Sequence, residues 1–264
     1  MRTTRSLIFA AAAGFAATAV ATQPNEARAQ APAEAVVQPV RLGAPSRPPD
    51  ARGRAVLVKA NAERGLKILV STEDRWLWLV SGRDTVMSVQ VAIGMAKSFE
   101  FEGKNFWFET PRSERSVLGK AENPVWNVPE WHYMERAKAR GYALHRLTKE
   151  EKHLLEDDSF ILTIGDNVGR LNTYGNFHPF DPGIEIMFDS KVFVPPVGTR
   201  QRGVPEALGP FKLDTGDGYL IHGTHIYNED SIGTAVSHGC VRMRNEDLTR
   251  LYPLVPVGTK VFVF

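Results

Sequence analysis

The sequence predicts a mainly β fold with short helices. After Arg54, short segments rich in Val, Ile, Leu and Trp are separated by turn residues, and similar segments return toward the C-terminus. Runs of this length and composition are typical of strands. Between them, Thr110-Pro111, Asn123-Pro124 and Val128-Pro129 break any long element. With 264 residues and 43% hydrophobic side chains, the chain can build one large domain or two small ones.

Residues 1–29 have the pattern of a secretory signal peptide. Arg2 and Arg5 precede an apolar run from Leu7 to Ala21, and Ala27-Arg28-Ala29 offers small residues for cleavage. The run is too short to span a membrane as a helix. We therefore expect export to the periplasm or cell envelope, with no transmembrane segment after cleavage. An uncleaved N-terminal anchor is the alternative.

Residues 30–54 contain five prolines and few large apolar side chains, so we interpret them as an extended tether or a disordered new N-terminus.

Removal of residues 1–29 takes away three of 32 basic and one of 30 acidic side chains, which leaves 29 of each. This balance argues against a nucleic-acid-binding protein, which usually has a basic excess. We therefore expect a polymer or small molecule outside the cytoplasm as the partner of a folded domain over residues 55–264.

The first part of that domain is predicted to be antiparallel β. Ser81-Gly82-Arg83-Asp84 lies between two apolar runs and predicts a hairpin connection. Residues 95–158 are less regular, and we expect loops and short helices there. The predicted strands are Ala55–Lys59, Lys67–Val70, Arg75–Val80 and Val86–Ile93, and the predicted helices are Tyr133–Arg140 and Lys149–Glu156.

Strand patterns return in the second half of the chain. Near its end, Asn245 is suited to cap a short helix, because Glu246 and Asp247 favour the positive first turn and an apolar face follows. Cys240 therefore lies just before a short helix. The predicted strands are Phe160–Ile164, Gly183–Phe188, Lys191–Val194, Phe211–Leu213, Tyr219–His222 and Lys260–Phe264.

Cys240 is the only cysteine, so an exported form of this chain has no internal disulfide. A nucleophilic thiol needs a neighbouring base or positive charge, because free cysteine is mostly protonated at neutral pH. His238 is two residues away, on the same face of an extended segment, and His222 ends a predicted strand from which it could approach the thiol. The pattern indicates an activated cysteine rather than an inert buried thiol.

A zinc site is the alternative chemistry, with His222, His225, His238 and Cys240 as four possible ligands. Structural zinc sites usually contain closely spaced cysteine pairs, and catalytic ones usually include a carboxylate that this stretch offers only ambiguously. We therefore expect no metal.

The residues around Cys240 resemble a known family. His222-Gly223-Thr224, followed by Ser237-His238-Gly239-Cys240-Val241-Arg242-Met243 and Asn245-Glu246-Asp247, is similar to the active-site signature of the L,D-transpeptidases. These are penicillin-insensitive enzymes that cross-link peptidoglycan. The resemblance extends to the strands ending at Gly94, and it covers most of residues 55–264. Further matching stretches are Leu208-Gly209-Pro210-Phe211 and Gly258-Thr259-Lys260-Val261.

The resemblance implies a β-sandwich-like catalytic fold in which Cys240 attacks the carbonyl between the third and fourth residues of a tetrapeptide stem. D-alanine leaves, a thioester forms, and an amine of a second stem resolves it. The resemblance also implies that His222 is the base, with the Gly223 carbonyl holding its ring. Backbone N–H groups near Gly239 and Cys240 are expected to face the oxyanion. No cofactor is implied, and carbapenem-type β-lactams are expected to acylate Cys240.

Three further residues of the motif are expected to support the site. His238 becomes a substrate contact or a residue that supports the catalytic side chains. Arg242 could orient the loop, bind a stem carboxylate through its planar fork, or pair with a nearby acid. Ser237 is expected to support the loop through its hydroxyl.

Two features depart from the family pattern. Family members commonly carry Thr-Pro-x-Gly after the first strands, whereas this chain has Thr110-Pro111-Arg112-Ser113. Residues 95–160 are also long, and we interpret them as an insertion that could form a lid over the thioester. Trp107, Trp126 and Trp131 lie there and are expected in the core by default, with the lining of a groove as the alternative.

The same site supports several functions. A stem amine as acceptor gives a cross-link, a lipoprotein amine gives anchoring to peptidoglycan, and water gives an L,D-carboxypeptidase or endopeptidase. A papain-like peptidase is disfavoured, because its cysteine precedes its histidine whereas His222 precedes Cys240. An inactive cell-wall-binding protein is the non-enzyme alternative. Cross-linking is the favoured function.

Overall fold

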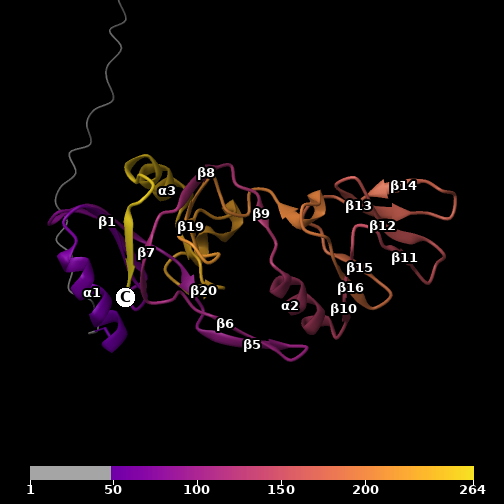
Figure 1. Ribbon diagram of the computed structural model, residues 1–264, viewed down its shortest axis with the longest axis horizontal. Coiled ribbons are helices and arrows are strands. Elements are labelled where there is room, and N and C mark those ends of the chain that lie inside the picture. Colours follow the sequence, from indigo (N-terminus) through magenta and orange to yellow (C-terminus); the bar gives the residue numbers. More distant parts are fainter. Residues whose placement is uncertain (1–48) are drawn as a thin grey trace, which may run out of the picture. The chain divides into compact units, whose positions relative to one another are not determined.

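The computed structural model describes residues 49–264 (Figure 1). The predicted signal peptide and most of the predicted tether lie outside the described residues. Within the described part, none of the helices has the length and apolar character needed to cross a membrane.

The first described element is a helix and not the predicted strand. Helix α1 covers Ala51–Ala62, so the strand prediction for Ala55–Lys59 and the tether boundary at residue 54 are both wrong. Asp50 caps the helix through its side chain. Val56 and Ala60 are buried one turn apart against the apolar face of the first strands. Short apolar runs do not distinguish a strand from a helix that buries one stripe, and packing decides here.

The main sheet has the order β3-β2-β1-β22-β7. The first three strands pair antiparallel as predicted, and Gly82 makes the turn between β2 and β3 with φ +61°. The yellow C-terminal strand β22 lies parallel to β1, between β1 and β7 (Figure 1). The strands cover β1 Leu66–Ser71, β2 Trp76–Ser81, β3 Asp84–Gln90, β7 Ser113–Ser116 and β22 Lys260–Val263.

A second sheet, of order β21-β19-β18-β8, carries the residues of the cysteine motif. The two sheets share one hydrophobic core, in which Ile68 and Leu77 of the main sheet lie with Leu213, Ile221 and Val241 of the second. Helix α3 and the 3-10 helix η3 close this core at its end. The elements cover β8 Gly119–Glu122, β18 Phe211–Asp214, β19 Leu220–His222, β21 Val241–Arg242, α3 Asn245–Leu251 and η3 Tyr252–Leu254.

The middle of the chain contains many more strands than predicted. Helix α2, Glu130–Arg140, agrees with the prediction, but the predicted helix Lys149–Glu156 is wrong. It contains strand β11, Lys152–Leu154, which pairs with β12, Phe160–Ile164. The charged Lys-Glu-Glu-Lys run favours a helix by propensity, and strand pairing outweighs that preference.

The strand pairing shows a segment that leaves the two sheets and later returns to them, which we call the excursion. Its limits differ from those of the predicted insertion, 95–160. β7 and β8 fall inside these limits and yet pair with β22 of the main sheet and β18 of the second sheet. The chain instead leaves these sheets at β9, Trp126–Asn127, and returns at β17, Gly203–Val204, which pairs with β9. The segment between β9 and β17 holds helix α2 and two sheets of its own, β10-β16-β15 and β11-β12-β13-β14.

This excursion has its own apolar cores. One contains Leu147, Ile161, Val168, Ile186 and Phe193, and none of these residues belongs to the core that the main and second sheets share.

The remaining elements are β4 Ile93–Gly94, β5 Lys97–Phe101, β6 Lys104–Phe108, β10 Ala143–Arg146, β13 Asn167–Leu171, β14 Phe177–Pro179, β15 Ile186–Phe188, β16 Lys191–Val194, β20 Ala235–Ser237, and the 3-10 helices η1 Arg200–Arg202 and η2 Ile226–Ser231.

Candidate active site

The cysteine and the upstream histidine lie on neighbouring parallel strands. In the β19–β21 pair, Ile221 is opposite Val241 and His222 is opposite Arg242. Cys240 directly precedes β21 and therefore lies near Leu220, whose backbone N–H reaches the thiol. His222 and the cysteine loop thus come from adjacent strands, and the thiol donates to the Gly218 carbonyl at 3.8 Å. The approach of His222 to the thiol stays a prediction.

His222 is buried and has one defined proton position. Its Nδ1 donates to the Gly223 carbonyl at 2.5 Å, and a carbonyl oxygen only accepts, so the proton lies on Nδ1. The lone pair is then on Nε2, as a general base requires. Burial, with a smaller contribution from the Arg242 charge, lowers the pKa of His222 to about 3. The ring is therefore neutral at physiological pH.

The Cys240 thiol is also neutral at rest. Its side chain is partly exposed, but burial raises its pKa above the ordinary value, against the opposing effects of the Leu220 N–H and the Arg242 charge. The raised pKa of the thiol and the lowered pKa of His222 both favour an uncharged pair over a thiolate and an imidazolium.

Ser237 holds the backbone of the cysteine loop, as its expected role requires. Its Oγ donates to the Cys240 carbonyl at 2.6 Å and accepts from the Gly239 N–H at 3.1 Å. The Gly239 N–H is thus already engaged. Of the two backbone N–H groups expected to face the oxyanion, the Cys240 N–H is the one that remains to donate to a substrate oxygen.

Thr110 ties the same loop to the first strands, a role that the sequence did not predict. Its Oγ1 donates to the Gly239 carbonyl at 2.9 Å and accepts from the Gly94 N–H at 2.8 Å. The hydroxyl is buried, so both bonds are shielded from water. The Thr-Pro dipeptide was the only local signal, and nothing in its spacing points to residue 239.

Gly239 is required by geometry. Its φ is +131°, and a Cβ there would lie 2.8 Å from a ring carbon of Tyr219 and 2.9 Å from the Glu109 carbonyl. Any other residue would be strained and would collide with backbone. The crowding comes from the protein itself, through Tyr219 and Glu109.

His238 faces the excursion. Its ring stacks on Trp131 with centroids 4.1 Å apart, and its Nε2 lies 3.0 Å from both carboxylate oxygens of Glu135. Trp131 and Glu135 both belong to α2. The expectation that His238 shares one face of an extended segment with Cys240 is wrong, because Gly239 interrupts that segment and the residues contact different elements.

Arg242 is half-buried and pairs with no acid within residues 49–264, so the structure does not support its interpretation as a strut. Burial lowers the pKa of its guanidinium, and its charge acts on both His222 and Cys240. A desolvated cation with free donors is therefore available to an anionic substrate group.

Asn245 has a different role from the one predicted. It is the first residue of α3, and the cap position belongs to Arg244, which makes no side-chain capping bond. The Asn245 side chain instead accepts from the Thr224 N–H and donates to the Thr224 carbonyl, both at 2.9 Å. This pair of bonds fixes the turn that follows His222. Only the fold shows this contact, since 21 residues separate the partners.

The four suggested zinc ligands do not gather in the described part of the chain. His222 bonds Gly223, His238 pairs with Glu135, and His225 accepts from the backbone of its own turn. The group that could hold an ion lies elsewhere, in the excursion.

The default core prediction is wrong for Trp107, whereas Trp126 packs against an apolar core cluster that includes Val128 and Tyr133. Trp107 is 56% exposed, and Trp126 and Trp131 are partly buried. Trp131 contacts the candidate site through His238, as the groove-lining alternative allowed. Ser113, which replaces the glycine of the family turn, simply begins β7.

Comparison with known proteins identifies the family. The L,D-transpeptidase catalytic domain model, YkuD, matches residues 66–263. The chain is 49% identical over 59 residues to "Probable L,D-transpeptidase YbiS" of Escherichia coli (strain K12), which is 22% of this chain and 19% of the relative. It is 35% identical over 92 residues to "Probable L,D-transpeptidase ErfK/SrfK" of Salmonella typhimurium (strain LT2), 30% of this chain and 29% of the relative. The matches thus span about a fifth to a third of these relatives' own length.

Among solved structures, the L,D-transpeptidase (residues 123–326) from Xylanimonas cellulosilytica DSM 15894 aligns at 14% identity with a TM-score of 0.40, covering 76% of this chain and 61% of that chain. The family match covers both catalytic sheets and the whole cysteine motif. The chain therefore belongs to the L,D-transpeptidase catalytic-domain family.

Proposed function

We propose that this protein is an exported peptidoglycan L,D-transpeptidase that uses Cys240 as nucleophile and His222 as base. The observation that carries the proposal is the β19–β21 pair. It puts the cysteine loop beside a neutral histidine whose tautomer is set by Gly223, in a chain of the L,D-transpeptidase family. Residues 1–29 support export, and the released product of the first half-reaction is D-alanine.

In the first half-reaction, Cys240 Sγ forms a bond to the stem carbonyl carbon while its proton passes to His222 Nε2. The carbonyl oxygen becomes an oxyanion near the Cys240 N–H. Collapse breaks the C–N bond, and the D-alanine nitrogen takes the proton from His222. The product is a thioester. The low pKa of His222 makes its protonated form a strong acid toward the leaving amine.

In the second half-reaction, an amine of another stem attacks the thioester carbon and gives a proton to His222. The C–S bond breaks, and the thiolate takes that proton back. Arg242 is suited to bind an anionic group of a stem, because it is desolvated and has no acidic partner among residues 49–264. Stem peptides carry carboxylates that can fill this role.

A cavity lies beside the turn that follows His222, and its lining includes neither Cys240 nor His222. It measures about 340 Å³ and is lined in part by Thr224, His225, Ile226 and Asn245. Asn245 lines this cavity and also makes two hydrogen bonds to the backbone of Thr224. It therefore holds both the cavity wall and the turn that follows His222.

The decisive test is incubation with a purified disaccharide tetrapeptide, followed by mass spectrometry of the products. A dimer formed with loss of one D-alanine establishes transpeptidation. Tripeptide without dimer makes the protein an L,D-carboxypeptidase. Cys240→Ala is the matched control and should give neither product, and turnover by that variant would refute the assigned nucleophile.

Inactivity toward the free muropeptide would have two explanations, which further experiments distinguish. Transfer of the acyl group to a lysine-bearing lipoprotein peptide would identify an anchoring enzyme with the same nucleophile. Absence of transfer to any amine, together with retained binding to isolated cell wall, would identify an inactive wall-binding protein. A carbapenem mass adduct that is present in the parent chain and missing in Cys240→Ser separates these two outcomes, because only a competent nucleophile is acylated.

A further inference from the structure

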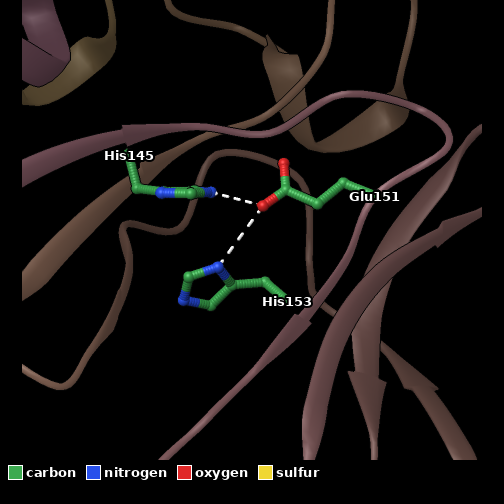
Figure 2. Close-up of side chains that lie close together, drawn as sticks. All are labelled: His145, Glu151 and His153. Carbon is green, nitrogen blue, oxygen red and sulfur yellow. Dashed lines mark hydrogen bonds and ion pairs between the residues drawn. The ribbon is translucent and has the colours of Figure 1, made fainter.

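Three side chains in the excursion converge on one point, outside both catalytic sheets (Figure 2). Glu151 Oε1 lies 2.6 Å from His145 Nε2 and 3.3 Å from His153 Nδ1. The three potential ligand atoms all lie within 4.8 Å of one another. We propose that His145, Glu151 and His153 form a binding site for a divalent transition metal ion of the zinc type.

The donor set points to this class of ion. Two imidazole nitrogens and one carboxylate oxygen suit zinc and similar ions, whereas magnesium and calcium prefer oxygen ligands alone. Ligands of a tetrahedral zinc ion at its usual bond lengths are about 3.3 Å apart. The His153–Glu151 separation already has this value, and the His145–Glu151 separation of 2.6 Å has to lengthen by about 0.7 Å.

The surroundings hold the ligands in place. Both imidazoles lie against the buried ring of Phe193, with centroid distances of 5.2 Å for His145 and 5.0 Å for His153. The second carboxylate oxygen of Glu151 accepts from the Thr148 N–H at 3.2 Å, which orients the group. Outer contacts of this kind are typical of sites that keep their ligands aligned.

The degree of burial suits a site with one position open to water. The side chains are 16% exposed for His153, 24% for Glu151 and 29% for His145. The Nε2 of His153 is buried with no hydrogen-bond partner among the described residues, and it would carry the ring proton when Nδ1 binds the ion.

The site joins two sheets that are otherwise separate in their strand pairing. His145 is on β10 of the three-stranded sheet, and His153 is on β11 of the four-stranded sheet. An ion there connects the sheets of the excursion without touching the candidate active site. We therefore expect it to stabilise the excursion and not to take part in the acyl transfer.

The test uses the chain with Cys240→Ala, so that the thiol cannot bind zinc. After treatment with chelator, we expect one equivalent of Zn²⁺ to bind in calorimetric titration, with no competition from excess Mg²⁺. Glu151→Gln keeps the shape of the side chain and should weaken binding by about tenfold or more, because a charged ligand is lost. His178→Ala, which removes an exposed histidine on β14, is the matched control and should bind as the parent does.

A second measurement does not depend on how the variants fold. In the parent chain, Zn²⁺ should protect His145 and His153 from modification by diethylpyrocarbonate and leave His178 reactive. The proposal is overturned if Zn²⁺ fails to bind stoichiometrically, or if it binds equally well to Glu151→Gln, or if the two histidines stay reactive when zinc is bound. None of these outcomes depends on transpeptidase activity.

Discussion

At the scale of single residues, the two central groups of the site are both kept neutral by desolvation. Burial lowers the pKa of His222 and raises that of Cys240. The proposed mechanism therefore couples proton transfer to attack, with the thiol and not the thiolate as the resting species. This differs from cysteine enzymes in which a preformed ion pair makes the thiol reactive at neutral pH.

The raised thiol pKa predicts how Cys240 reacts with iodoacetamide. Only the thiolate is alkylated, so the rate should keep rising with pH beyond pH 9, the ordinary pKa for this group. The measurement is the rate of mass gain between pH 6 and pH 10, with a short cysteine peptide as the reference. A plateau near pH 7 would show that the thiol pKa is lowered instead.

The buried hydroxyl of Thr110 predicts a large effect of a small substitution. Thr110→Val keeps the shape but removes both bonds to the cysteine loop, so the free energy of unfolding should fall by about 1–3 kcal/mol. Thr163→Val is the matched control, since the Thr163 hydroxyl is buried without a partner and its removal should be neutral or stabilising. Urea unfolding of both variants measures the difference, and equal effects would contradict the assigned role.

At the scale of elements, helix α2 connects the excursion to the candidate site. Trp131 and Glu135 lie one turn apart on α2 and both contact His238, which precedes the cysteine by two residues. The excursion therefore supports the cysteine loop whether or not it also acts as a lid. The lid interpretation stays a prediction.

The stacking predicts a loss of activity on removal of Trp131. An aromatic pair contributes about 0.5–1.5 kcal/mol, so Trp131→Ala should lower kcat by up to about tenfold through misplacement of His238. The effect should appear in kcat more than in KM, and Glu135→Gln should act in the same direction. Trp107→Ala, at an exposed position, is the control and should leave kcat unchanged. Equal kcat values for the two tryptophan variants would show that α2 does not support the candidate active site.

Helix α1 covers one face of the main sheet, and its buried stripe predicts an asymmetric response to charge. Val56→Asp places a carboxylate against an apolar cluster that includes Trp78 and Phe264, and it should cost about 3 kcal/mol or more of stability. Val58→Asp, at a position that is 70% exposed, should change stability by about 0.5 kcal/mol or less. Thermal unfolding of the two variants decides whether α1 belongs to the folded domain.

At the scale of the whole molecule, the buried His222 and the partly buried His132 predict acid lability. The pKa of His222 is lowered to about 3 and that of His132 to about 4, in both cases mainly by burial. Below their ordinary value of about 6.5, the unfolded chain binds protons that the folded chain does not. Stability is therefore fully present above pH 6.5 and falls as the pH drops toward 3, by about 1.4 kcal/mol per pH unit for each group.

Urea unfolding at pH 7, 6 and 5 measures this slope. His132→Gln should make the fall shallower by removing one of the two contributions, and it leaves His222 as the remaining group. A free energy of unfolding that is constant from pH 7 to pH 5 would show that these histidines are not held neutral by the fold.

The local sequence was sufficient for some of these features. The β1–β2–β3 hairpins, α2, β19 and the last strand follow from short-range apolar patterns, and the cysteine motif pointed to its own chemistry and family. The supporting role of Ser237 also follows from local geometry, because the atoms involved are at most three residues apart. The need for glycine at residue 239 does not, because the atoms that a Cβ would meet belong to Glu109 and Tyr219.

Other features depend on contacts between distant parts of the chain, which no local pattern encodes. The helical state of α1, the strand state of β11, the clamp made by Asn245 and the link from Thr110 to Gly239 are of this kind. So are the two pKa shifts, since burial by the surrounding sheets sets them. The sequence by itself determined the fold class, the family and the candidate residues of the site. Tertiary packing decided their protonation state, their supports and the His145–Glu151–His153 cluster, because desolvation and long-range hydrogen bonds exist only in the folded molecule.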